Sequence, residues 1–183
     1  LVWVLSKKFI MSFLKNSSWL LIMSMSFSSI QCQNSGGKSN NAMVPEFLKD
    51  SVLVRGLNYP WEILWGPDNY IWMTERCGKI SRVNPTTGSV KLVYTIPEVV
   101  SNGEGGLLGM ALHPDFSSKP QVFVAYDYNN GENYREKIVR FTFNGNTLVN
   151  PVTIIDNIAA ASIHDGCRLL ISPDQKLFIS TGD

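Results

Sequence analysis

The chain of 183 residues is 44% hydrophobic, 17% charged and 11% aromatic, with a formal net charge of +1. This balance excludes an intrinsically disordered chain, which combines few apolar residues with a high net charge. No run of Lys and Arg occurs, so the sequence also argues against a nucleic-acid-binding protein. Three cysteines are too few for a disulfide framework, and no Cys-x-x-Cys or Cys/His cluster predicts a zinc site.

Residues 1–31 have the pattern of an export signal. They contain Lys7, Lys8 and Lys15 but no acidic residue, followed by the apolar run 19–25. A basic segment before a short apolar run is typical of a secretory signal peptide, and a spanning helix would need about 20 apolar residues. We therefore expect residues 1–31 to be a signal peptide. Because Met11 opens a better-proportioned signal, residues 1–10 are candidates for a misassigned gene start.

Cys32 follows this leader and opens a polar, Gly/Ser-rich linker, residues 32–43. Its position resembles that of the lipidated cysteine in bacterial lipoproteins, although Ser29 and Gln31 depart from the residues usual there. Two alternatives stay open, a lipid anchor at Cys32 or ordinary export to the periplasm. Both place the protein in the bacterial cell envelope.

From residue 44 onward, one pattern occurs three times: an apolar strand, a Pro-Asp turn and a second strand. The turns fall at residues 67–68, 114–115 and 173–174, about 45 to 60 residues apart. Proline presets φ for the second position of a turn and Asp tolerates the next, so each repeat predicts a β-hairpin. The spacing is typical of a four-stranded propeller blade with loop insertions.

Further strands are predicted at residues 79–83, 90–95, 122–128 and 138–143, separated by turn signals. No dozen residues beyond the leader keep a helical apolar period without Gly or Pro, so no helix is predicted. The sequence therefore predicts an all-β, propeller-like fold of about two to three blades. Since a propeller needs at least four blades, we expect residues 44–183 to be the N-terminal part of a truncated propeller.

Six motifs in this region, in order and in proportionate spacing, resemble those of the soluble glucose/sorbosone dehydrogenase family. They are residues 56–62 (GLNYPWE), 72–76 (WMTER), 78–84 (GKISRVN), 103–109 (GEGGLLG), 113–116 (HPDF) and 164–169 (HDGCRL). Members are six-bladed β-propellers that depend on pyrroloquinoline quinone and calcium. The resemblance implies an exported quinoprotein dehydrogenase that oxidises the C1 hydroxyl of aldose sugars to lactones and passes electrons to a respiratory acceptor. Calcium and most quinone ligands come from later blades in this family, so no metal ligand is assigned in this chain.

The resemblance assigns His164 as the general base that takes the proton of the anomeric hydroxyl while hydride passes to the quinone. Imidazole suits this role because it can accept a proton near neutral pH and return it to solvent. Asp183 falls where the family has a carboxylate that orients this histidine, which would fix its tautomer. Without the surrounding motif, a surface histidine and a turn aspartate would be the ordinary interpretations.

Three further residues depart from the family pattern or have more than one interpretation. Glu104 occupies the place of a substrate-binding Gln in this family, and since an ionised carboxylate accepts hydrogen bonds without donating, its sugar contacts must differ. The alternative is a solvent-exposed acid in a Gly-rich turn. Arg168 fits either a contact to the acidic cofactor or a structural ion pair. Cys167 replaces a Gly beside the base, which would alter the pocket or mark an inactive member.

Other residues are expected to be structural. His113, next to a Pro-Asp turn, is predicted to support that turn, while strand alternation predicts Trp65, Trp72 and Tyr126 as core residues between blades. Two alternatives to the dehydrogenase remain, a non-catalytic propeller that binds a partner and a calcium-dependent lactone hydrolase. Propeller folds host many functions, so the fold alone does not choose among them.

Overall fold

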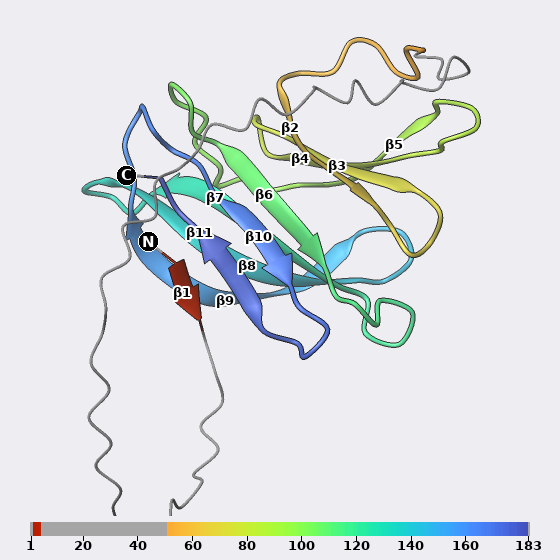
Figure 1. Ribbon diagram of the computed structural model, residues 1–183. Coiled ribbons are helices and arrows are strands. Elements are labelled where there is room, and N and C mark those ends of the chain that lie inside the picture. Colours follow the sequence, from red (N-terminus) through yellow and green to blue (C-terminus); the bar gives the residue numbers. More distant parts are fainter. Residues whose placement is uncertain (1, 5–50, 183) are drawn as a thin grey trace, which may run out of the picture. The chain divides into compact units, whose positions relative to one another are not determined.

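The computed structural model describes residues 2–4 and 51–182, in which all regular structure is β-strand (Figure 1). Within these ranges no helix has the length and apolar character needed to cross a membrane. The predicted signal peptide, the linker with Cys32, and Asp183 lie outside the described residues, apart from the short strand at 2–4.

The described strands form three antiparallel sheets (Figure 1). Sheet B has the order β2 (Pro60–Trp65), β3 (Ile71–Glu75), β4 (Lys79–Val83) and β5 (Val90–Thr95). Sheet C has the order β6 (Leu107–Leu112), β7 (Gln121–Asn129), β8 (Tyr134–Phe143) and β9 (Leu148–Ala159). Sheet A has the order β1 (Val2–Val4), β11 (Leu177–Ser180) and β10 (Arg168–Ile171). Sheets B and C are two consecutive four-stranded meanders, and β10–β11 begin a third, which confirms the predicted two to three blades.

The Pro-Asp turns connect the predicted hairpins. In the β2–β3 turn, the N–H of Gly66 donates to the carbonyl of Tyr70 at 2.8 Å, and Asn69 adopts φ +60°, a conformation that Asn tolerates well. The β10–β11 turn repeats this arrangement with Gln175 at φ +62°. In the β6–β7 turn, buried His113 accepts a hydrogen bond from the N–H of Asp115 at 3.0 Å, in agreement with its predicted structural role.

Strand β9 is the one long element that the sequence pattern did not predict. Asn150 and Asn157 have φ values of +52° and +60°, and the β8–β9 register shifts at three places. Such bulges break the alternation of apolar and polar residues on which strand prediction depends. Pro151 adds a turn signal, although proline is tolerated on an edge strand such as β9.

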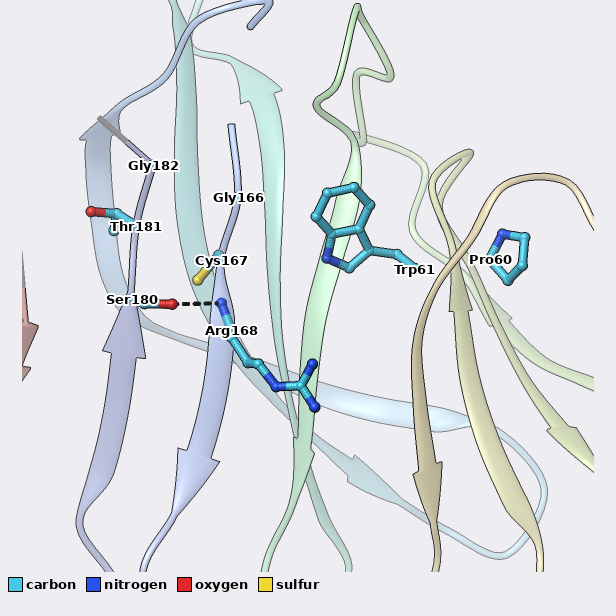
Figure 2. Close-up of a pocket in the computed structure, with 8 residues that line it drawn as sticks. All are labelled: Pro60, Trp61, Gly166, Cys167, Arg168, Ser180, Thr181 and Gly182. Atoms are coloured by element: carbon cyan, nitrogen blue, oxygen red, sulfur yellow. Dashed lines mark hydrogen bonds between the residues drawn. The ribbon is translucent and has the colours of Figure 1, made fainter. Parts of the chain in front are cut away.

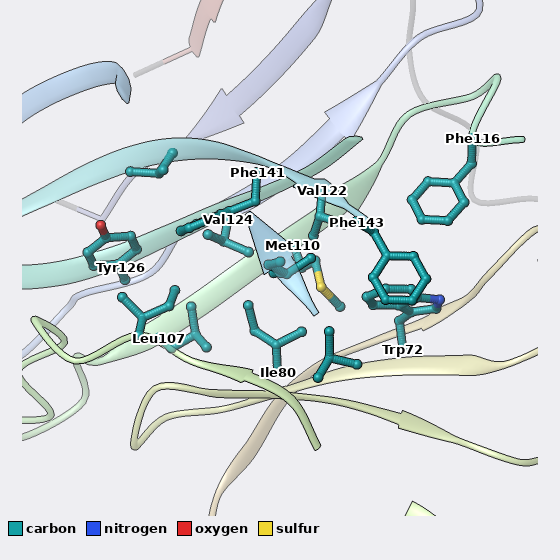
Figure 3. Close-up of a cluster of buried hydrophobic side chains, with 14 of the residues drawn as sticks. Trp72, Ile80, Leu107, Met110, Phe116, Val122, Val124, Tyr126, Phe141 and Phe143 are labelled. Carbon is teal, nitrogen blue, oxygen red and sulfur yellow. The ribbon is translucent and has the colours of Figure 1, made fainter. Parts of the chain in front are cut away.

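The main apolar core lies between sheets B and C (Figure 3). Trp72 is fully buried and meets Phe116 and Phe143 edge to face, with ring centroids 5.7 and 5.1 Å apart. Tyr126 is also buried, as predicted. Trp65, in contrast, is 64% exposed, so the core contact predicted for it is not present among the described residues. Leu64 pairs with Trp72 in the register and packs against the core, so the next residue on β2 points to the opposite face.

A second apolar cluster lies between sheets C and A. Leu108 and Ala111 of β6 pack there with Leu169 and Ile179, whereas Leu107 and Met110 of the same strand face sheet B. Both faces of β6 are therefore covered, which accounts for its continuous apolar sequence.

Candidate functional site

Two loops that are far apart in the sequence meet at one end of the described strands. The loop between β5 and β6 carries Glu104, and the loop between β9 and β10 carries His164. The N–H of Glu104 donates to the carbonyl of Ser162 at 2.9 Å, and the N–H of His164 donates to Oε2 of Glu104 at 2.7 Å. Two of the residues singled out from the sequence are thus in direct contact.

The backbone of His164 is held in an unusual conformation. Its φ of +59° lies in the left-handed region that L residues rarely adopt. Gly182 packs against its other side, because a Cβ at that position would collide with the carbonyl oxygen of His164. The predicted partner Asp183 is the next residue, but it lies outside the described residues.

Arg76, at the end of β3, supports the Glu104 loop from sheet B. Its guanidinium donates to the carbonyl of Gly105 at 2.9 and 3.1 Å and also bonds the carbonyl of Gly103. The backbone carbonyls of Gly103 and Gly105, on either side of Glu104, are therefore both held by the planar guanidinium, whose several N–H donors can reach both oxygens.

Three buried or half-buried acids lie behind the two loops: Asp127 and Glu136 from sheet C and Asp165 from the His164 loop. Asp127 accepts a hydrogen bond from the N–H of Gly106 at 2.7 Å, and Asp165 accepts one from the N–H of Ala161 at 3.0 Å. Each acid has one oxygen without a hydrogen-bond partner among the described residues. Gly105 packs among them, since a Cβ there would collide with Asp127 and the Tyr134 hydroxyl.

Burial is the main cause of the altered acidity of this cluster. It raises the pKa of Asp127 to about 6, with the charge of Asp165 adding to the effect. Burial likewise raises the pKa of Glu136 to about 8, although a hydrogen bond with the Cys167 thiol opposes the shift. The pKa of Asp165 is raised by its burial and by the charge of Glu104. Glu136 therefore holds a proton at neutral pH, which limits the repulsion among these carboxyl groups.

Cys167 is buried in the apolar cluster between sheets C and A, next to Leu108 and Ala125. Burial raises the pKa of its thiol, and the neighbouring Glu136 adds to this effect. A thiol whose pKa is raised in this way is unreactive as a nucleophile. Its side chain acts in the structure as a small apolar group beneath the His164 loop.

An open pocket of about 550 Å³ adjoins the His164 loop between β2 and the β10–β11 hairpin (Figure 2). Its walls consist of Pro60, Trp61, Gly166, Cys167, Arg168, Ser180, Thr181 and Gly182. The Arg168 side chain is 75% exposed and lies 3.5 Å from the buried carboxylate of Glu62. Both interpretations of Arg168, an ion pair and a ligand contact, are compatible with this position.

Sequence reasoning missed the buried acids and Arg76 as parts of the site. A usable signal exists for Asp127, because a charged residue between Tyr126 and Tyr128 interrupts a strand that is otherwise buried. Asp165 directly follows His164, but nothing in its local sequence indicates that it points back toward Asp127. Within residues 2–4 and 51–182, no group of three or more His, Cys, Asp or Glu side chains is placed to hold a metal ion.

Comparison with known proteins gives consistent matches. The Glucose / Sorbosone dehydrogenase family model matches residues 57–183. Quinoprotein glucose dehydrogenase B of Acinetobacter calcoaceticus is 42% identical over 143 residues, which cover 72% of this chain and 30% of that protein. The aldose sugar dehydrogenase YliI of Escherichia coli is 30% identical over 83 residues, covering 45% of this chain and 22% of that protein.

Solved structures match in the same region. The PQQ-bound form of the aldose sugar dehydrogenase of Streptomyces coelicolor superimposes with a TM-score of 0.63 at 33% identity, covering 72% of this chain and 40% of that one. The chain spans less than a third of the length of the two curated relatives. The matched region therefore corresponds to one part of those larger proteins.

Proposed function

Because the chain belongs to the glucose/sorbosone dehydrogenase family and has its β-propeller fold, we propose that the complete protein is an exported quinoprotein that oxidises the C1 hydroxyl of aldose sugars to lactones. The observation that carries this proposal is the contact between two separate family motifs, 103–109 and 164–169, beside an open pocket. Electrons would leave through a respiratory acceptor.

The residues of the pocket fit part of the expected cofactor, pyrroloquinoline quinone. The quinone has three carboxylates, one of which could pair with the exposed guanidinium of Arg168. Trp61 of β2 offers an aromatic surface in the same pocket. When bound, the quinone supplies the hydride acceptor. The family also uses calcium, for which we propose ligands outside this chain.

We assign the proton transfer to His164. Its imidazole would take the proton from the sugar hydroxyl and release it to solvent, while Asp183 would orient the ring. Glu104 would line the sugar site and accept hydrogen bonds from sugar hydroxyls. The backbone contacts on both sides of His164 support this role, because a general base works best from a fixed position.

The test is His164→Ala in the complete gene product. We expect quinone-dependent aldose oxidation to disappear while the affinity for pyrroloquinoline quinone stays within about threefold, since His164 supplies the base and the pocket walls supply the binding. Ile163→Ala is the matched control, because Ile163 is an exposed neighbour in the same loop. Near-normal turnover in His164→Ala would contradict the assignment.

Two other outcomes would identify the alternatives. A complete protein that binds no quinone in the presence of calcium would be a binding module, and lactone hydrolysis without quinone would indicate a hydrolase. Export is tested separately by fractionation with and without globomycin, which blocks lipoprotein maturation. A soluble periplasmic protein that is indifferent to globomycin would exclude the anchor at Cys32.

A further inference from the structure

We propose that Glu104 is a positioning residue, whose carboxylate holds the backbone of the base histidine in its active conformation. The inference deepens the proposed function and depends on it for the identity of His164 as the base. In addition to contacting the sugar, Glu104 would then act on the reaction indirectly, through the backbone of His164.

The contact joins two loops that have no sequence proximity. Oε2 of Glu104 accepts the His164 N–H at 2.7 Å across 60 residues of chain. The N–H of Glu104 donates in return to Ser162, two residues before His164, at 2.9 Å. A hydrogen bond from an N–H to an ionised carboxylate is stronger than one between neutral groups, so Glu104 can restrain the loop at this point.

His164 requires such a restraint because its φ of +59° is unfavourable for an L residue. The stretch from Ser162 to His164 is exposed, so burial contributes little to its conformation. The Glu104 bond fixes the N–H side of His164, and the close approach of Gly182 confines the carbonyl side. Both contacts restrain the backbone from which the imidazole extends.

Glu104 is itself supported on both sides. Arg76 binds the carbonyls of Gly103 and Gly105, and Asp127 accepts the N–H of Gly106 at 2.7 Å. Gly103 also packs closely on the Ser162 carbonyl, where any Cβ would collide. The Glu104 loop is therefore a fixed platform, and its carboxylate is the side-chain link from that platform to the His164 N–H.

The experiment compares Glu104→Ala with Glu104→Gln in the complete gene product. Glutamine keeps an oxygen that can accept the His164 N–H, whereas alanine has none. We expect Glu104→Ala to lower kcat about ten- to a hundred-fold, the usual effect of losing a bond to a charged group, and Glu104→Gln to recover kcat to within about threefold. Amide exchange of a peptide covering residues 160–168 should accelerate about tenfold in Glu104→Ala and clearly less in Glu104→Gln, which keeps a neutral acceptor for the His164 N–H.

A raised KM with unchanged kcat and unchanged exchange in Glu104→Ala would overturn the proposal, because it would restrict Glu104 to a sugar contact. Equal loss of kcat in both variants would also overturn it. The exchange measurement requires no turnover, so it tests the link from Glu104 to His164 even if the unsubstituted protein oxidises no aldose. That last result would refute the proposed function alone.

Discussion

The interface between sheets B and C and the junction at His164 are built from different interactions. At the interface, buried aromatic and aliphatic side chains from both sheets, Trp72 among them, pack against one another (Figure 3). At the junction, exposed backbone is held by a few hydrogen bonds, one residue has a left-handed φ, and acids with raised pKa lie behind it. The first arrangement stabilises the fold, and the second uses that stability to hold a local geometry that is unfavourable by itself.

Trp72→Ala tests the interface and should have the largest effect. It would remove a fully buried ring, its two edge-to-face contacts and the indole N–H bond to Asp68. We expect the free energy of unfolding to fall by about 3–5 kcal/mol, measured by denaturant titration of the complete protein. Trp72→Phe keeps an aromatic ring in the core and should cost clearly less. Equal losses for both variants would mean that ring packing is not what holds the sheets together.

Thr74→Val tests a polar link between the same two sheets. The buried Thr74 hydroxyl accepts the N–H of Glu62 at 3.0 Å and donates to the carbonyl of Leu108 on β6 at 2.8 Å. Valine has the same shape but leaves both groups without this partner, so we expect a loss of about 1–3 kcal/mol in the same titration. Thr74→Ser retains the hydroxyl and should lie close to the unsubstituted protein. A neutral Thr74→Val would show that water satisfies both groups.

The blades were predictable because local signals determine them. Pro-Asp turns and short apolar runs located the hairpins, and β4 and β5 have the predicted bounds. For Trp65, alternation gives the period but not which face of the strand meets a described sheet. Strand β9 escaped prediction because its bulges at Asn150 and Asn157 remove the period itself.

The site was predictable only through the family resemblance. No local pattern indicates that Glu104 meets His164, because the contact depends on how two complete sheets place their connecting loops. The buried acids depend on tertiary packing in the same way. Glu136 lies in the run Arg135-Glu136-Lys137, which in isolation is typical of an exposed strand edge, yet its side chain is only 3% exposed.

Glu136→Gln tests the acid cluster through pH. Burial raises the pKa of Glu136 from 4.5 to about 8, so the folded state holds a proton that the unfolded state releases. The contribution of this proton to the free energy of unfolding is complete below pH 4.5 and is lost as pH rises through about 8. Glutamine cannot ionise, so we expect Glu136→Gln to raise the free energy of unfolding by about 1–2 kcal/mol at pH 8.5 and by much less at pH 5. The gain at pH 8.5 is smaller than the whole pKa shift of Glu136 would give, because Asp127 and Asp165 share in the titration.

Thermal melts at the two pH values would measure this difference. Glu132→Gln is the matched control for the substitution itself, because Glu132 lies in the exposed turn before β8. A pH-independent effect of Glu136→Gln would mean that Glu136 is ionised in the folded protein.

Arg168→Ala should change the free energy of unfolding least, yet it distinguishes a structural role of Arg168 from a role in binding the quinone. Its guanidinium is 75% exposed and lies 3.5 Å from Glu62, a long ion pair that water screens, so its loss should cost less than about 1 kcal/mol. If Arg168 also binds a carboxylate of the quinone, Arg168→Ala should lower the affinity for pyrroloquinoline quinone about tenfold or more, as measured by titration. Arg168→Lys should recover this affinity only in part, because lysine lacks the planar pair of donors. Unchanged affinity together with a stability loss would assign Arg168 to the ion pair with Glu62 and place the quinone contacts elsewhere in the propeller.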